Sequence, residues 1–168
     1  MISKKIRLIN CDRKILESIA QGNDTLSKYL NVKVIDKWTA FGNQIFEWAL
    51  QQLLKNPDSK KWYTYLPIEI KSNTLIGTCG YKGPPDENGM VEIGYEVAEK
   101  FRNRGYATEI AQILINAAFE NRVIKVILAH TLPEESASVK VLKKCDFKFV
   151  KEVYDSEDGT IWQWEKVK

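Results

Sequence analysis

One change of hydrophobic period, in the middle of the chain, constrains the fold more than any other feature of the sequence. Residues 90–97 have the β-branched and aromatic composition of a strand, whereas a helical period of apolar residues begins after Ala107. Between them lies a short loop that carries two arginines and Gly105. The chain is therefore expected to run from a strand, through a loop rich in free amides, into the N-terminus of a helix.

This junction has the physical properties of an anion site. Unpaired backbone N–H groups and the positive end of a helix meet at one point, which is how a chain binds phosphate or pyrophosphate. Gly105 lets the backbone approach the anion, and Ala107 leaves the helix start uncrowded. Arg102 and Arg104 add positive charge. Since the glycine-rich fingerprint of dinucleotide-binding folds and the Gly-Lys-Ser/Thr phosphate loop are both missing, these properties predict an anion without identifying it.

The flanking segments are predicted from their periodicity and their turn residues. The first third is mostly helical: a short strand at 6–9 precedes a helix that Asp12 caps, and a second helix covers 39–54. Further strands are expected at 62–70, 74–81, 90–97, 125–129, 147–153 and 160–164, and further helices from Ala107 to about 120 and from Pro133 to about 144.

The composition limits the classes of function. The 168 residues suit one domain spanning 1–168, and 44% hydrophobic with 28% charged residues predicts a folded core. A net charge of +3 suits a small anionic ligand and does not require nucleic acid or a membrane as partner.

Neither a signal peptide nor an apolar run of about 18 residues occurs, which predicts a cytoplasmic protein. Cys11, Cys79 and Cys145 are isolated, so buried thiols are expected rather than disulfides or a metal site.

The junction and the segments around it resemble one family. Arg102-x-x-Gly105-x-Ala107 matches the Q/R-x-x-G-x-G/A acyl-CoA motif of the GNAT superfamily of N-acetyltransferases. Similarity to the branch that acetylates the N-termini of ribosomal proteins lies in Glu92–Tyr95, Leu132–Glu134, Ala137–Val139 and Leu142–Phe147, within about Leu75 to Val153. The resemblance implies an α/β fold in one domain, with a mixed, mostly antiparallel sheet of about seven strands, flanked by helices and splayed in the middle to admit acyl-CoA.

The same resemblance implies transfer of an acetyl group from acetyl-CoA to a primary amine, by direct attack in a ternary complex and without a metal. Backbone N–H groups of Tyr95, Glu96 and Val97 would bind pantetheine and the thioester oxygen. The pyrophosphate of coenzyme A would lie against Arg102, Asn103, Arg104, Gly105, Tyr106, Ala107 and Thr108.

Two side chains are catalytic candidates by their family positions. Glu92 is the expected general base, acting through water, and the alternative is an exposed strand glutamate without a role. Glu96, on the same strand face, is a weaker alternative. Ser138 either donates to the departing thiolate, binds pantetheine or only caps its helix. His130 follows a predicted strand end with no nucleophile near it, so we expect it to lie outside the chemistry.

Three positions depart from the family pattern. Glu135 stands where the branch usually has an asparagine that contacts pantetheine, and an ionised carboxylate cannot donate a hydrogen bond there. Leu142 stands where many members have the tyrosine that protonates the thiolate. Asp146 replaces a glycine in a turn, at a small expected cost in stability, because aspartate tolerates the left-handed conformation.

These departures keep a second hypothesis open, a catalytically weak acyl-CoA-binding sensor or interaction module. A third hypothesis, nucleic-acid binding through lysines, is disfavoured by the mild charge and the missing motifs. A peptide or protein N-terminus, an antibiotic, a polyamine and a free amino acid all stay open as acceptor, in a monomer or a homodimer. Five aromatic residues are expected in the acceptor pocket or in the core: Tyr29, Trp38, Phe41, Phe46 and Trp48.

Overall fold

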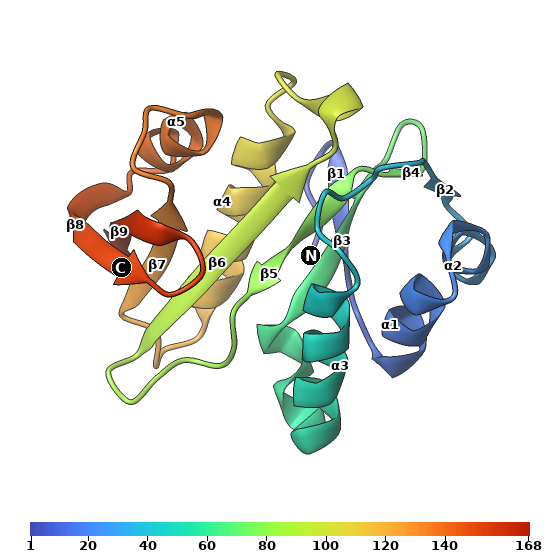
Figure 1. The fold of residues 1–168 in the computed structure, drawn as a ribbon, viewed down its shortest axis with the longest axis horizontal. Helices are drawn as coiled ribbons and strands as arrows, with labels where there is room; N and C mark the ends of the chain where they lie inside the picture. The colour runs from blue at the N-terminus through green and yellow to red at the C-terminus, as the bar shows by residue number, and fades with distance from the viewer.

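The computed structural model describes residues 1–168 as one twisted sheet with helices against both of its faces (Figure 1). The N-terminal half contains β1 (Ile6–Asn10), α1 (Arg13–Ala20), α2 (Asn23–Leu30), β2 (Lys33–Val34), α3 (Gln44–Lys55), the 3₁₀ helix η1 (Pro57–Trp62), β3 (Thr64–Glu69), β4 (Thr74–Leu75) and β5 (Gly77–Tyr81). The C-terminal half contains β6 (Met90–Val97), the 3₁₀ helix η2 (Glu99–Phe101), α4 (Tyr106–Glu120), β7 (Val126–Thr131), α5 (Ala137–Lys144), β8 (Lys148–Asp155) and β9 (Gly159–Val167). None of the helices combines the length and the apolar character needed to cross a membrane.

The sheet has the order β2-β4-β3-β5-β6-β7-β9-β8, and β1 pairs with β3 beside this path. Neighbouring strands are antiparallel except β2 with β4 and β6 with β7, so the expected mixed, mostly antiparallel sheet is confirmed. Nine strands form instead of about seven. β2 has only two residues, too few to leave a period in the sequence. The strand expected at 74–81 is divided at Ile76, whose N–H bonds to Pro67 while its carbonyl accepts from Ala98.

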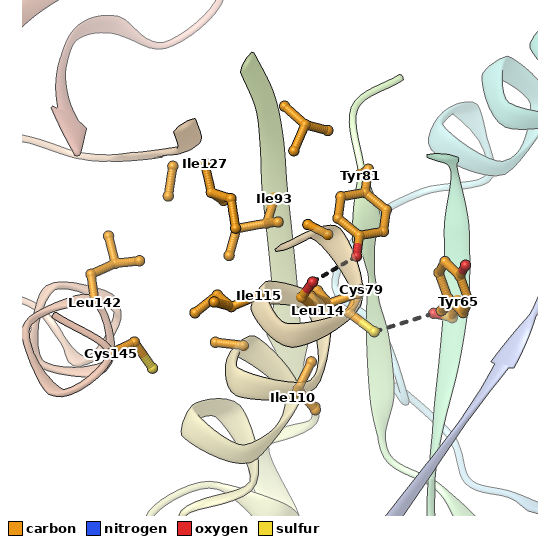
Figure 2. Packing of buried hydrophobic residues seen from close by; sticks show 14 of the residues in the cluster. Tyr65, Cys79, Tyr81, Ile93, Ile110, Leu114, Ile115, Ile127, Leu142 and Cys145 are labelled. Carbon is orange, nitrogen blue, oxygen red and sulfur yellow. Dashed lines mark hydrogen bonds between the residues drawn. The ribbon is translucent and has the colours of Figure 1, made fainter. Parts of the chain in front are cut away.

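Two hydrophobic clusters lie on opposite faces of the sheet. On one face, α4 and α5 pack over the central strands and bury residues such as Ile93, Leu114 and Ile127. Figure 2 shows these side chains around α4, where the Tyr81 hydroxyl also donates to the Leu114 carbonyl at 2.7 Å. On the other face, α1, α2 and α3 pack over β3 and β4. Full burial of each large aliphatic side chain stabilises the fold by about 1.5–3 kcal/mol, so both helical layers hold the sheet.

The start of the chain largely follows its sequence pattern. β1 is the first strand, as expected, and the Asp12 side chain caps α1 by accepting the Ile15 N–H at 2.9 Å. α2 forms a separate helix after Gly22, which the sequence pattern did not distinguish. The three cysteines are all buried and free, and burial raises the pKa of each thiol, as expected for structural cysteines.

α5 begins later than its sequence pattern predicts. Its N-cap is Ser136, which accepts the Val139 N–H, and Pro133 lies outside the helix. At its other end, Asp146 has φ 62°, the left-handed conformation expected at this glycine position. The N–H groups of Asp146 and Phe147 bond back to carbonyls of the last turn, as in a Schellman motif. The departure at this turn therefore leaves the local fold intact.

β6 and β7 separate in the middle of the sheet, which confirms the splay that the family resemblance implies (Figure 1). The two strands pair in parallel only over 90–92, against 126–128. Beyond this point β6 remains paired with β5 alone, as far as Val97. One edge of β6 therefore lacks a neighbouring strand over its last residues.

The backbone register decides which groups of β6 face this opening. Lys82 donates to the Glu92 carbonyl and Ala98 donates to the Ile76 carbonyl, so even-numbered residues of β6 turn their backbone groups toward β5. The N–H groups of Tyr95 and Val97 therefore face the opening. The N–H group of Glu96 points toward β5 instead.

Candidate active site

The loop before α4 has the open backbone geometry that an anion site requires. Gly105 has φ 82°, and open space lies where a side chain would begin. The first hydrogen bond of α4 runs from the Glu109 N–H to the Gly105 carbonyl, so the N–H groups of residues 106–108 have no partner within the helix. These donors open into a cavity of about 480 Å³, which Lys140 and Lys144 of α5 also line. An anion bound here would meet free amides, the helix N-terminus and two lysines.

Six of the seven residues predicted for the pyrophosphate line this cavity: Arg102, Asn103, Gly105, Tyr106, Ala107 and Thr108. The seventh, Arg104, does not, and its guanidinium lies 5.6 Å from the centre of the Phe101 ring. Arg102 is held toward β6, because its Nε donates to the Val97 carbonyl at 3.0 Å. The arginine thus ties the anion end of the site to the end of the open strand.

A second cavity, of about 320 Å³, continues from the first into the opening between β6 and β7. Both cavities are lined by Val97, Arg102 and Ala107, and we call the two together the α4–α5 groove. The N–H groups of Tyr95 and Val97 face its inner end, as the strand register requires. An elongated ligand with an anionic centre and a polar arm would find hydrogen-bond donors along the length of this groove.

Tyr95 crosses the inner end of the α4–α5 groove. Its hydroxyl donates to the Ser138 carbonyl on α5 at 3.4 Å. Burial raises the pKa of Tyr95 above its ordinary range, so the hydroxyl stays protonated at neutral pH. Ser138 itself lines the groove. Tyr95 and the backbone of Ser138 therefore join β6 to α5 across the inner end of the groove.

Glu135 does not lie in the α4–α5 groove. Its carboxylate pairs with Lys143 at 2.6 Å and lines a different cavity, beside Trp162 and Trp164 of β9. The structure thus does not bring Glu135 together with the other predicted cofactor residues. Leu142 lies on the core-facing side of α5, where it is buried, and its side chain does not line the groove.

A smaller cavity, of about 140 Å³, lies where α3 faces β5 and β6, and we call it the α3 cavity. Gly80 and Gly94 are directly opposed on the two strands, which removes two neighbouring side chains from its floor. Phe41 and Tyr95 stand among its walls. Because Tyr95 also lines the α4–α5 groove, this residue separates the two spaces. A ligand in each would meet beside it.

The segment before α3 is fixed to β6 by a side chain. The Glu96 carboxylate accepts the Thr39 hydroxyl and the Ala40 N–H, each at 2.8 Å. The prediction that α3 begins at Thr39 is wrong for this reason, since these groups bond to β6 and the helix begins at Gln44. The contact anchors the loop that carries Phe41, so Glu96 shapes the α3 cavity and both of its oxygens are occupied.

Glu92 lies in a cluster of charged groups on the α3 face of the sheet. Its Oε1 is 2.5 Å from the Lys82 Nζ and 2.9 Å from the His130 Nδ1. The expectation that His130 follows a strand end is wrong, because β7 continues to Thr131. Sequence reasoning missed this contact because Glu92 and His130 are 38 positions apart, and the chain between them folds into α4 and its connections. The parallel pairing of β6 with β7 brings Glu92 and His130 together, and predicting this pairing would have revealed the contact.

The aromatic residues of the first third divide between core and surface. Trp38 and Phe46 are buried, with ring centres 5.5 Å apart, whereas Tyr29 and Trp48 are about half exposed. Of the five, only Phe41 lines the α3 cavity. No group of three or more histidine, cysteine, aspartate or glutamate side chains is placed to hold a metal ion.

Known proteins share this architecture. The ribosomal-protein-S5-alanine acetyltransferase of Vibrio fischeri superposes with a TM-score of 0.72 and 14% identity, over 99% of this chain and 95% of that one. The microcin C7 self-immunity acetyltransferase MccE, solved in complex with acetyl-CoA and AMP, superposes with a TM-score of 0.70 and 14% identity, over 99% of this chain and 94% of that one. At these identities the likeness concerns the fold.

Sequence similarity extends the likeness to the family. The uncharacterized N-acetyltransferase YjdG of Bacillus subtilis (strain 168) is 28% identical over 148 residues, which cover 86% of this chain and 87% of that protein. The family model of the acetyltransferase (GNAT) domain matches residues 15–148. This span includes the loop before α4, the opening between β6 and β7 and most of the helical layer formed by α1, α2 and α3. The chain therefore belongs to the GNAT family of acetyltransferases.

Proposed function

We propose that the chain transfers an acetyl group from acetyl-CoA to a primary amine, by direct attack of the neutral amine on the thioester. The observation that carries the proposal is the meeting of two spaces at Tyr95: the α4–α5 groove, with its anion site at the far end, and the α3 cavity. A cofactor in the groove and an amine in the cavity would approach each other there. Catalysis then rests mainly on positioning both substrates.

The groove supplies the contacts that coenzyme A requires. The pyrophosphate would bind the free N–H groups at the start of α4, beside Arg102 and the lysines of α5. The amide groups of pantetheine would pair with the open edge of β6. The thioester oxygen would accept from the Tyr95 or Val97 N–H, which face the opening. This division assigns binding mostly to backbone groups.

Proton transfer is assigned to two side-chain positions. The Glu92 cluster lies on the α3 face beside Gly94, where the attacking amine would lose its proton. Ser138 lies in the groove, where its hydroxyl would serve the departing thiolate. Ser136, not Ser138, caps α5, so the Ser138 hydroxyl is not used as that cap.

A peptide N-terminus is the first acceptor to test, followed by a polyamine. The fold likeness to a ribosomal-protein acetyltransferase supports the first choice. The alternative is an acyl-CoA-binding module without turnover. It is suggested by Leu142, which is buried where many family members have the tyrosine that protonates the thiolate, and by Glu135, which lies outside the groove. The two candidates differ in one observable, the appearance of acetylated amine.

Calorimetric titration with acetyl-CoA tests the proposal. Wild-type protein should bind, and Gly105→Glu should weaken binding by about 100-fold or more, because a carboxylate at the anion site opposes the pyrophosphate. Gly159→Glu is the matched control, since Gly159 also has a positive φ, 74°, and open space around it, in the β8–β9 turn. Absence of binding by the wild type, or equal loss in both variants, would contradict the proposal.

Mass spectrometry then separates enzyme from sensor. Wild-type protein with acetyl-CoA is incubated with a serine-initiated peptide, an alanine-initiated peptide and spermidine, and the acetylated products are measured. Acetylation of any of the three supports the transferase. Tight acetyl-CoA binding with no acetylated product from any of them would favour the binding module.

A further inference from the structure

His130 and Glu92 meet across the opening between β6 and β7. His130 lies on β7 two residues beyond Leu128, the last residue that pairs with β6. The two side chains are only 19% and 20% exposed, and the contact between Nδ1 and Oε1 is 2.9 Å. Partial burial strengthens such a contact relative to one on the surface, so the imidazole has a fixed place beside the point where the strands diverge.

The partner of Nδ1 fixes which ring nitrogen is basic. An ionised carboxylate can only accept a hydrogen bond, so a neutral imidazole must place its proton on Nδ1 to bond with Glu92. The lone pair then belongs to Nε2. The atom of His130 that can accept a proton is therefore the one turned away from Glu92.

Glu92 is less suited than His130 to accept a proton from substrate. Its Oε1 already receives two groups, the Lys82 Nζ at 2.5 Å and the His130 Nδ1. With Lys82 and His130 both bound to Oε1, the oxygen that faces the opening is already occupied by two protein partners. Holding an imidazole in one tautomer and one orientation is the role that such a carboxylate serves well.

We propose that His130 Nε2 accepts the proton of the attacking amine and that Glu92 is a positioning residue which orients the ring. This inference rests on the proposed acetyl transfer and assigns the proton step within it. The amine nitrogen bonds to the acetyl carbon, the carbon–sulfur bond breaks, and one amine proton passes to Nε2. The thiolate of coenzyme A takes a proton from water or from the Ser138 hydroxyl, which then regains one from water. The imidazolium releases its proton to water, so both side chains return to their starting state.

The variant His130→Asn distinguishes a base from a structural side chain. The amide of His130→Asn can donate to Glu92 as Nδ1–H does, but it has no basic nitrogen. If His130 is the base, His130→Asn and His130→Ala both lower kcat by about 10²- to 10⁴-fold, with little change in the acetyl-CoA Kd. If His130 only holds Glu92 in place, His130→Asn retains nearly the wild-type kcat, and the proposal is overturned.

Glu92→Gln gives the complementary readout. The glutamine carbonyl can still accept from Nδ1–H, so the ring keeps its orientation and kcat should fall by only about 10-fold. Added imidazole should restore acetylation by His130→Ala and not by Glu92→Gln, because only the first variant lacks the base. A loss in Glu92→Gln equal to or larger than that in His130→Asn makes Glu92 the base and overturns the proposal, as does a lack of rescue by imidazole.

The assay follows acetylated amine by mass spectrometry, with the best acceptor among a serine-initiated peptide, an alanine-initiated peptide and spermidine. Thiol release is not used, because imidazole itself can take an acetyl group. Acetyl-CoA titration of each variant shows that the fold and the groove are intact. A wild-type protein that acetylates none of the three acceptors overturns the proposed function and this assignment with it. An active wild type with an active His130→Asn overturns the assignment alone.

Discussion

The α4–α5 groove and the α3 cavity are built in different ways. The groove comes from two short stretches of chain, 95–108 and 136–144, and it offers free backbone N–H groups at the start of α4 and along the open edge of β6. The α3 cavity takes its walls from α3 and the loop before it, from β3, from β5 and from β6. Backbone groups persist when side chains change, whereas a cavity of side chains changes with each of them. This difference explains how one cofactor site can serve many acceptors.

The largest effect is expected at the floor of the α3 cavity. A Cβ at Gly80 would lie 2.1 Å from the Tyr63 carbonyl oxygen, whereas a Cβ at Gly94 meets nothing within 4 Å. We therefore expect Gly80→Ala to lower the free energy of unfolding by about 2–3 kcal/mol, because the β3 and β5 backbones must move apart. Gly94→Ala should change it by less than about 0.5 kcal/mol. Urea unfolding of both variants measures the difference.

A larger side chain at Gly94 turns this pair into a test of the two spaces. Gly94→Leu should raise the acceptor KM, since the side chain enters the α3 cavity, and should leave the acetyl-CoA Kd unchanged. Equal destabilisation by alanine at Gly80 and Gly94 would show that the cavity floor is not formed as described. Loss of acetyl-CoA affinity in Gly94→Leu would show that the two spaces are not separate.

A smaller effect is expected where one residue serves both spaces. Glu96 lies on β6 beside the groove, but its carboxylate holds the loop of Thr39 and Ala40. Thr39→Val has nearly the same shape but loses the hydroxyl, which donates to Glu96 and also accepts the Phe41 N–H at 3.1 Å. The acceptor KM should therefore rise by about 5- to 30-fold, equivalent to two hydrogen bonds of about 1 kcal/mol or less each. Steady-state kinetics with the acceptor varied and acetyl-CoA saturating measures this change.

The control for this variant is Thr160→Val, on an exposed position of β9 that contacts neither space. It should leave both kinetic constants unchanged. If Thr39→Val weakens acetyl-CoA binding as much as it weakens the acceptor, the loop before α3 belongs to the cofactor site as well. The α4–α5 groove and the α3 cavity would then not be separate binding sites.

The features that could be predicted from the sequence are those set by neighbouring residues. The loop with Gly105, the cap at Asp12 and the left-handed turn at Asp146 each depend on a few consecutive residues, and all three are present. Hydrogen bonds that span the chain were not predictable. Thr39 lies 57 residues from Glu96, and a helical pattern concealed its role as a tether. Likewise, a strand end placed two residues too early removed His130 from the site. Long-range pairing, which periodicity does not encode, decides both.

The smallest effect is expected at Asp155, at the end of β8. Its carboxylate accepts the Glu157 N–H at 2.8 Å and the Asp158 N–H at 3.0 Å, and the bond from Asp158, then that from Glu157, holds the pKa of Asp155 below its ordinary value of 3.8. Lys82 and His130 lower this pKa further. Because the folded-state pKa lies below the unfolded one, the stabilisation is complete above the ordinary value and is lost as pH falls through the folded-state pKa.

Asp155→Asn should therefore be slightly less stable than wild type at neutral pH, and the difference should be smaller at a pH below the ordinary value of 3.8. Urea unfolding at both pH values measures it, with Asp158→Asn as control, since that side chain is not the acceptor in this turn. Lys82 and His130 interact electrostatically with Asp155. Removing the charge of Asp155 should therefore change the kinetic constants for the acceptor without changing the affinity for acetyl-CoA. A difference that grows at low pH would show that the carboxylate is not stabilised as an anion. A change in acetyl-CoA affinity would instead mean that the β8–β9 turn influences the α4–α5 groove. The groove and the α3 cavity would then not be independent at this end of the sheet.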